Sequence, residues 1–94
     1  LSEEEKQDAA NFHKSLLLVQ GALNAGEKNS KKLKALFKKN IASYKNIKLD
    51  YISIARSNDL KEVLKINSQE ILVSSAIYYK TVRLIDNFTY LPST

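Results

Sequence analysis

Two apolar, β-rich runs lie close together near the C-terminus, at residues 71–79 (ILVSSAIYY) and 82–88 (VRLIDNF). Such runs, separated by only a few residues, predict a β-hairpin. Because strand side chains alternate between the two faces, Leu84 and Phe88 are expected on one face and Arg83 on the other. The hairpin therefore commits the end of this chain to an antiparallel sheet.

The first half of the chain has a helical period instead. Apolar residues recur three and four positions apart and predict a helix over roughly residues 3–25. These residues are Ala9, Phe12, Leu16, Val19 and Leu23. Ser2, followed three residues later by Glu5, is a capping-box pattern for the start of this helix. Gly26 is suited to a left-handed C-cap at its end.

A second helix is expected to begin at Ser30, which is placed to cap it, and the helical layer is expected to stop at about Asn46. Its apolar positions fall on one face: Leu33, Leu36, Phe37, Ile41 and Tyr44.

The period then changes from helical to alternating. Ile47, Leu49 and Tyr51 alternate with Lys48, Asp50 and Ile52, which predicts a strand ending near Ala55. Residues 56–59 form a turn cluster, and residues 60–64 are expected to form one helical turn within a connection outside the core. The order of elements predicts an α+β domain with two N-terminal helices packed on a three-stranded antiparallel sheet.

Length and composition exclude several classes of protein. The 94 residues are enough for one domain, residues 1–94, but not for a large core around a deep cleft. No apolar run approaches the roughly 18 residues of a membrane span, so a soluble protein without a membrane partner is expected. With no cysteine and one histidine, a zinc or iron site is nearly excluded.

Few side chains are candidates for chemistry. His13 has no second histidine and no nearby serine nucleophile, which argues against catalysis. The acidic run 3–5 can bind a metal in principle, but complementarity to the helix dipole explains it better. The aromatic residues of the predicted strands are expected in the core or on a sheet face; they are Tyr51, Tyr78, Tyr79 and Tyr90. We therefore assign no catalytic, cofactor-binding or metal-binding residue to this chain.

Arg83 and Asp86 leave two interpretations open. One is a contact with an active-site cleft or a partner domain, and the other, which we favour, is an internal ion pair or turn cap. Positions three apart on a regular strand face opposite ways, so the two residues can pair only if the strand bends or ends between them. Asp86 is expected at a strand end, where it accepts backbone N–H bonds.

A run of lysines provides the rival functional interpretation. Eight lysines lie in a span without any acidic residue: Lys28, Lys31, Lys32, Lys34, Lys38, Lys39, Lys45 and Lys48. A basic second helix beside a small sheet can track phosphates, as in a winged-helix DNA reader. Nucleic-acid sites usually mix arginine and aromatic residues with the charge, so we prefer a solvated face and no nucleic-acid partner.

The C-terminal half resembles a known family. Four segments are similar to the C-terminal domain of pantothenate synthetase, the pantoate–β-alanine ligase. They are residues 1–5 (LSEEE), 49–52 (LDYI), 76–80 and above all 83–87 (RLIDN). The likeness covers nearly the whole chain in the right order, and residues 83–87 are its most specific part.

The resemblance implies a larger, cytoplasmic, ATP-dependent ligase that uses magnesium. A separate N-terminal nucleotide-binding domain would carry the histidines and lysine that act on ATP. Such an enzyme would condense pantoate and β-alanine to pantothenate through a pantoyl adenylate, and would dimerise through the N-terminal domain. This chain would be a cap over the active site, with the N-terminal domain as its partner. By itself it is expected to be inactive and to bind no cofactor.

The sequence departs from the family at the hairpin turn. The family tends to have a glycine after the apolar run, where this chain has residues 79–81 (YKT). A non-glycine residue at positive φ is uncommon, so a turn of another type is expected here.

Overall fold

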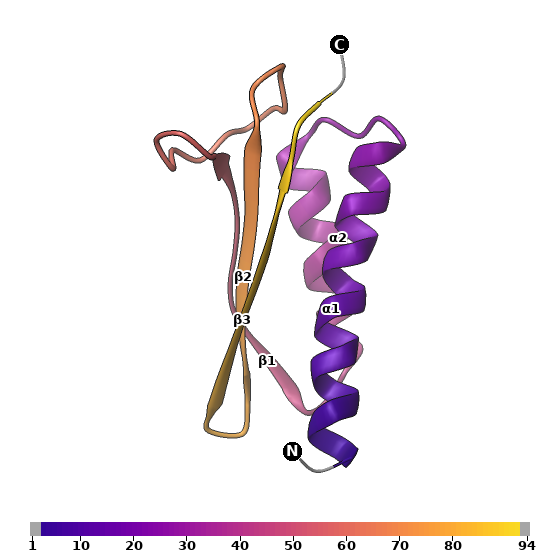
Figure 1. Ribbon diagram of the computed structural model, residues 1–94. Coiled ribbons are helices and arrows are strands. Elements are labelled where there is room, and N and C mark those ends of the chain that lie inside the picture. The colour runs from indigo at the N-terminus through magenta and orange to yellow at the C-terminus, as the bar shows by residue number, and fades with distance from the viewer. Residues whose placement is uncertain (1–2, 93–94) are drawn as a thin grey trace.

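The computed structural model describes residues 3–92, which form two layers. Helices α1 (Glu3–Asn24) and α2 (Ser30–Ala42) cover one face of a sheet made of β1 (Ile47–Arg56), β2 (Ile71–Tyr79) and β3 (Val82–Tyr90). The strand order is β1-β2-β3 and both pairs are antiparallel. Figure 1 shows both helices on the same side of the sheet. The predicted α+β fold class is confirmed.

The core lies between the helices and the inner face of the sheet. Leu16 and Val19 of α1, with Leu33 and Phe37 of α2, are almost completely buried. Phe12 meets the Phe37 ring edge-on, with centroids 6.3 Å apart. Removing side chains of this size from water supplies most of the stabilisation of a domain this small. The inner face of the sheet contributes six buried residues to the same core: Ile47, Ile52, Ile54, Ile71, Val73 and Ile77.

Helix α1 ends in a Schellman motif. Gly26 has φ of 104°, its N–H donates to the Leu23 carbonyl, and the Glu27 N–H donates to the Ala22 carbonyl. The predicted role of Gly26 is confirmed, and the helix ends at Asn24, one residue before the expected limit. The predicted Ser2 cap lies outside the described residues.

Helix α2 begins and ends differently from the prediction. Asn29 is the N-cap, and its side chain accepts from the Lys32 N–H at 3.2 Å. Ser30 is the first helical residue, and its buried hydroxyl donates to the Val63 carbonyl at 2.7 Å. The helix stops at Ala42, four residues earlier than expected, because Ser43 caps it. Three of the predicted apolar positions fill the core and Leu36 is turned partly to solvent; the three are Leu33, Phe37 and Ile41.

A β-bulge changes the phase of β1. Leu49 pairs with Ile77 and Tyr51 pairs with Ala76, so Asp50 is an extra residue without a partner on β2. Before the bulge Ile47 faces the core, and after it the buried residues are Ile52 and Ile54. The expected regular alternation of Ile47, Leu49 and Tyr51 is therefore wrong beyond Leu49, and Tyr51 is 36% exposed.

The segment between β1 and β2 is not the helical turn that the sequence suggests. Residues 60–64 contain no helix: Leu60 has φ of 60°, and Glu62 forms an antiparallel bridge with Ala55. The segment also belongs to the core, since Ile66 is 2% exposed and Val63 packs against the buried cluster. Backbone pairing along the edge of β1 replaces the predicted helical hydrogen bonds.

The hairpin between β2 and β3 is confirmed, and its turn comprises Lys80 and Thr81 between the paired Tyr79 and Val82. Lys80 has φ of 55°. The expectation that the turn would avoid a positive φ is therefore wrong, and a lysine occupies a backbone conformation that favours glycine.

Candidate functional site

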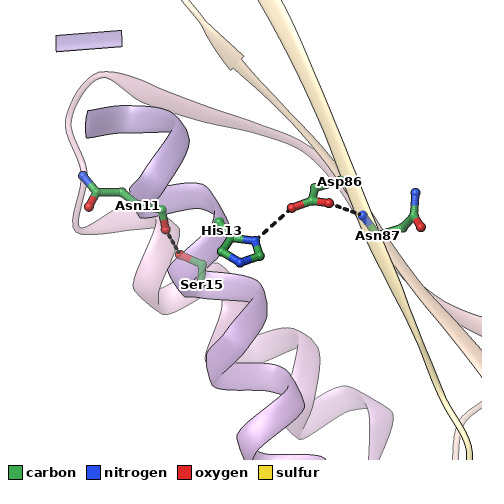
Figure 2. Close-up of polar contacts among 5 residues, drawn as sticks. All are labelled: Asn11, His13, Ser15, Asp86 and Asn87. Carbon is green, nitrogen blue, oxygen red and sulfur yellow. Dashed lines mark hydrogen bonds and ion pairs between the residues drawn. The ribbon is translucent and has the colours of Figure 1, made fainter. Parts of the chain in front are cut away.

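A side-chain contact between the helical layer and β3 joins His13 and Asp86, two residues 73 positions apart. The His13 Nδ1 lies 3.2 Å from the Asp86 Oδ2, and the other carboxylate oxygen accepts from the Asn87 backbone N–H at 2.9 Å. Figure 2 shows the imidazole reaching from α1 to the carboxylate on β3. We call His13, Asp86 and Asn87 the α1–β3 seam.

The chemistry open to the α1–β3 seam is limited. A carboxylate that accepts from Nδ1 fixes the orientation of an imidazole, as it does for a general base. A base also needs a reacting hydroxyl or water held within hydrogen-bond reach. The serine closest along the helix, Ser15, is fully buried and its hydroxyl already donates to the Asn11 carbonyl. The two side chains are 62% and 39% exposed, so the seam is a surface contact between α1 and β3.

A second polar link joins the two helices inside the core. The Ser15 hydroxyl donates to the Asn11 carbonyl at 2.9 Å and accepts from the Asn40 amide at 2.7 Å (Figure 2 shows the first of these bonds). Satisfying a fully buried hydroxyl in this way avoids the cost of an unpaired polar group. The link sets the register of α2 against α1.

On the outer, uncovered face of the sheet, the bulged Asp50 meets Arg83. The Asp50 Oδ2 lies 2.9 Å from both the Nε and the Nη2 of Arg83. The guanidinium also lies over the Tyr51 ring, 6.0 Å from its centroid. The favoured interpretation of an internal ion pair is confirmed for Arg83, although its partner is Asp50 and not Asp86.

The expected position of Asp86 is wrong. It lies inside β3, opposite Ser75, rather than at a strand end. It does accept one backbone N–H, that of the adjacent Asn87. Because its side chain points to the helical layer while that of Arg83 points outward, the two residues have separate partners.

Glu62 connects the segment between β1 and β2 to both layers. Its carboxylate accepts from the Lys34 ammonium at 3.0 Å and from the Ile54 N–H at 3.2 Å. Partial burial acts to raise the pKa of Glu62, but the hydrogen bonds from Ser53, Lys34 and Ile54 outweigh it, and the pKa lies below its ordinary value. Asp59 is exposed, and the Lys61 backbone N–H, with the Arg56 guanidinium, lowers its pKa.

The remaining candidates have structural roles. In the first turn of α1, Glu3 lies 4.0 Å from the Lys6 ammonium and Glu4 accepts from the Asn46 amide at 3.1 Å. Tyr79 is buried in the core, and Tyr90 donates its hydroxyl to the Leu23 carbonyl. Over residues 3–92 no group of three or more acidic or histidine side chains is arranged to hold a metal ion.

The lysines are distributed along exposed positions. Lys34 is paired with Glu62, whereas Lys31, Lys32, Lys38 and Lys39 face solvent around the core-packed stripe of α2. Within the described part of the chain, no helix is both long and apolar enough to cross a membrane.

Sequence reasoning singled out Asp86 and considered His13 but did not bring them together. Only the rotation of α1 about its axis, set by Phe12 and Leu16 in the core, turns His13 toward β3. A weak signal was available, because His13 adjoins the apolar stripe and Asp86 occupies an inward position of β3 beside Leu84.

The fold and these contacts define a small two-layer α+β domain, with polar contacts between its layers at the α1–β3 seam and at Glu62, and between its helices at the Ser15–Asn40 link. The sequence profile of the family described as pantoate-beta-alanine ligase matches residues 1–89. The chain belongs to the pantoate–β-alanine ligase family.

Individual relatives agree with this assignment. The chain is 41% identical over 90 residues to pantothenate synthetase from Clostridium botulinum (strain Langeland) and 40% identical over 90 residues to that from Enterococcus faecalis. Each alignment covers 96% of this chain and 32% of the relative. The chain thus spans about a third of the length of the curated relatives it matches.

The fold is also found in solved structures. Pantothenate synthetase from Thermus thermophilus matches with a TM-score of 0.76 and 20% sequence identity, over 94% of this chain and 31% of that protein. At this identity the likeness concerns the fold, and it confirms the arrangement of helices and strands described above.

Proposed function

We propose that this chain is the C-terminal domain of a pantoate–β-alanine ligase and acts as a cap over an active site carried by an N-terminal nucleotide-binding domain. The observation that supports this most directly is the family match over residues 1–89, combined with coverage of only 32% of the relatives. A domain that accounts for a third of an enzyme leaves the other two-thirds to carry the reacting groups.

The proposed reaction uses ATP, pantoate and β-alanine as substrates. The pantoate carboxylate would be adenylated with release of pyrophosphate, and the β-alanine amine would then displace AMP to give pantothenate. Residues 3–92 hold no group of three or more acidic or histidine side chains arranged for a metal ion, and the proposal assigns Mg²⁺ to the N-terminal domain.

The contribution of this domain would be to exclude water. An acyl adenylate hydrolyses if water reaches it, and closing domains protect reactive intermediates. A cap has to move as one body to do this. One buried core shared by α1, α2 and the sheet supports such a body, and the contacts from His13 to Asp86, from Lys34 to Glu62 and from Asn40 to Ser15 add to it.

The same proposal extends to partners and location. The N-terminal domain would be the partner of this chain, the full enzyme would dimerise through that domain, and the reaction would take place in the cytoplasm. The exposed lysines would contribute a weak positive field toward ATP and pantoate, which salt would screen. The nucleic-acid alternative is not favoured, because the named relatives are synthetases.

Calorimetric titration of ATP and pantoate into the 94-residue chain, beside turnover assays of this chain and of a full-length enzyme, tests the proposal. We expect no turnover by the chain alone and ATP binding no tighter than about millimolar, since it has no glycine-rich phosphate loop. Turnover by the chain alone, or micromolar binding of both ATP and pantoate, would contradict the assignment of the chemistry to the N-terminal domain.

A further inference from the structure

A pocket of about 280 Å³ lies at the end of the domain where β1 begins and the hairpin turns. Three of its five lining residues are lysines, and the other two carry a phenol and an amide: Lys45, Lys48, Lys80, Tyr78 and Asn46. The lysines come from the segment before β1, from β1 itself and from the turn after β2. In Figure 1 the start of β1 and this turn lie at the same end of the molecule.

The charge of this pocket is one-sided. No carboxylate is among its lining residues, and all three lysines are exposed. The arginine next to Tyr78 across the strands is Arg83, whose charge is balanced by Asp50. An acidic side chain does approach the rim, since Glu4 accepts from the Asn46 amide at 3.1 Å. By contrast, a hollow of about 650 Å³ near the β1–β2 segment is lined by both signs of charge.

The hairpin turn places the third lysine, Lys80, at this end of the domain. Its φ of 55° places a long side chain in the left-handed region, where glycine is favoured. Its ammonium lies 5.4 Å from the centroid of the Tyr79 ring. The two-residue turn between the paired Tyr79 and Val82 requires such a conformation, and it places Lys80 at the tip of the hairpin.

We propose that this lysine pocket binds a compact oxyanion with two or more negative charges, of the diphosphate type. Lysine binds phosphoryl groups as a point charge, and three lysines line this one small hollow, so that their charges act together on one multiply charged ligand. Tyr78 and Asn46 add neutral donors to the same ligand. The inference does not depend on the ligase assignment, because it rests on the geometry of this domain alone.

Titration of inorganic pyrophosphate into the ¹⁵N-labelled chain at constant ionic strength, followed by amide chemical shifts, tests the pocket. We expect saturable shifts concentrated at residues 45–48 and 78–81. The variant K45Q/K48Q/K80Q is expected to bind about tenfold more weakly or worse. All three lysines are exposed, so the dispersion of the same spectra will show that the variant is folded.

The matched control is K31Q/K32Q/K38Q, which removes the same charge from exposed positions of α2. It is expected to keep the affinity of the parent chain within about twofold. Equal loss in both variants, or shifts spread over all lysines, would show a diffuse charge effect and overturn the proposal. Monovalent acetate at the same ionic strength is expected not to saturate, and saturation equal to that of pyrophosphate would also overturn it.

Discussion

Asp50 and Arg83 lie on the two outer strands of the sheet, yet the Asp50 Oδ2 is 2.9 Å from both the Nε and the Nη2 of Arg83. The ion pair crosses β2 because the bulge in β1 leaves Asp50 unpaired on that strand. The contact thus holds the outer strands together over a face that no helix covers.

A double-mutant cycle measures this pair. Because both side chains are partly exposed, we expect a coupling energy of only about 0.2–1 kcal/mol between Arg83→Ala and Asp50→Ala in urea unfolding of the chain. The coupling should decrease at high salt. A cycle of Arg83 with Asp86 provides the control, and larger coupling to Asp86 would contradict the observed geometry.

In the full-length enzyme, under the proposed function, Arg83→Ala should affect closure or folding before chemistry. We expect lower stability, or a lower rate of pantothenate formation with more adenylate lost to water. Measuring pyrophosphate and pantothenate in the same assay separates these steps. A specific loss of pyrophosphate release, with stability unchanged, would instead assign Arg83 to adenylate formation.

Ser15→Ala should be more damaging than its small change in volume suggests. The Asn40 amide would lose the hydroxyl it donates to, and we expect a loss of about 1–3 kcal/mol in the free energy of unfolding. Ser68→Ala, at an exposed position between β1 and β2, is the control and should change stability by less than about 0.5 kcal/mol. Equal effects of the two changes would show that the buried link contributes nothing.

Leu60→Gly should stabilise the domain. Leu60 is 64% exposed and has φ of 60°, a backbone conformation that is unfavourable for leucine and accessible to glycine. Relief of this strain should outweigh both the small loss of burial and the entropy cost of glycine. We expect the free energy of unfolding to rise by about 0.5–1 kcal/mol. Leu64→Gly is the matched control, since Leu64 is 85% exposed and has no positive φ. Thermal melts of both variants decide the matter, and a lower melting temperature for Leu60→Gly would contradict the prediction.

Glu62 should make stability depend on pH in the acid range. Its pKa in the folded protein is below the ordinary value of 4.5, so the unfolded state binds the proton more readily. The resulting stabilisation is fully present above the unfolded pKa and is lost as the pH falls through the folded pKa. The stability difference between the parent chain and Glu62→Gln should therefore shrink from about pH 6 to about pH 3 in urea melts. Exposed Glu3→Gln is the control, and a difference independent of pH would contradict the assignment.

The elements with a clear period were predictable from the sequence. The spacing of Phe12, Leu16, Val19 and Leu23 identified α1, and the two β-rich runs identified the hairpin, because in each case a single stripe or face has to reach the core. The bulge left a readable trace as well. The core-facing apolar residues of β1 have odd numbers up to Leu49 and even numbers from Ile52 onward. A strand with regular alternation keeps one parity, so this change indicates an extra residue between them.

The contacts of the site were not predictable in the same way. Whether His13 meets Asp86 depends on the rotation of α1 and the position of β3 beneath it, and neither is encoded in local spacing. The same holds for Glu62, because the sequence of residues 60–64 favours a helical turn, while pairing with β1 and the Lys34 contact stabilise an extended path. Tertiary contacts overrode local propensity at both places.

The extended path of residues 61–63 also protects the domain from unwanted association. The Arg56 N–H donates to the Lys61 carbonyl and the Val63 N–H donates to the Ile54 carbonyl, so the C-terminal half of β1 has its outer backbone groups occupied. Exposed strand edges are templates on which other chains add strands and aggregate. Because residues 61–63 pair along this edge of β1, they shield the domain against fibre-like growth on that side without a fourth full strand.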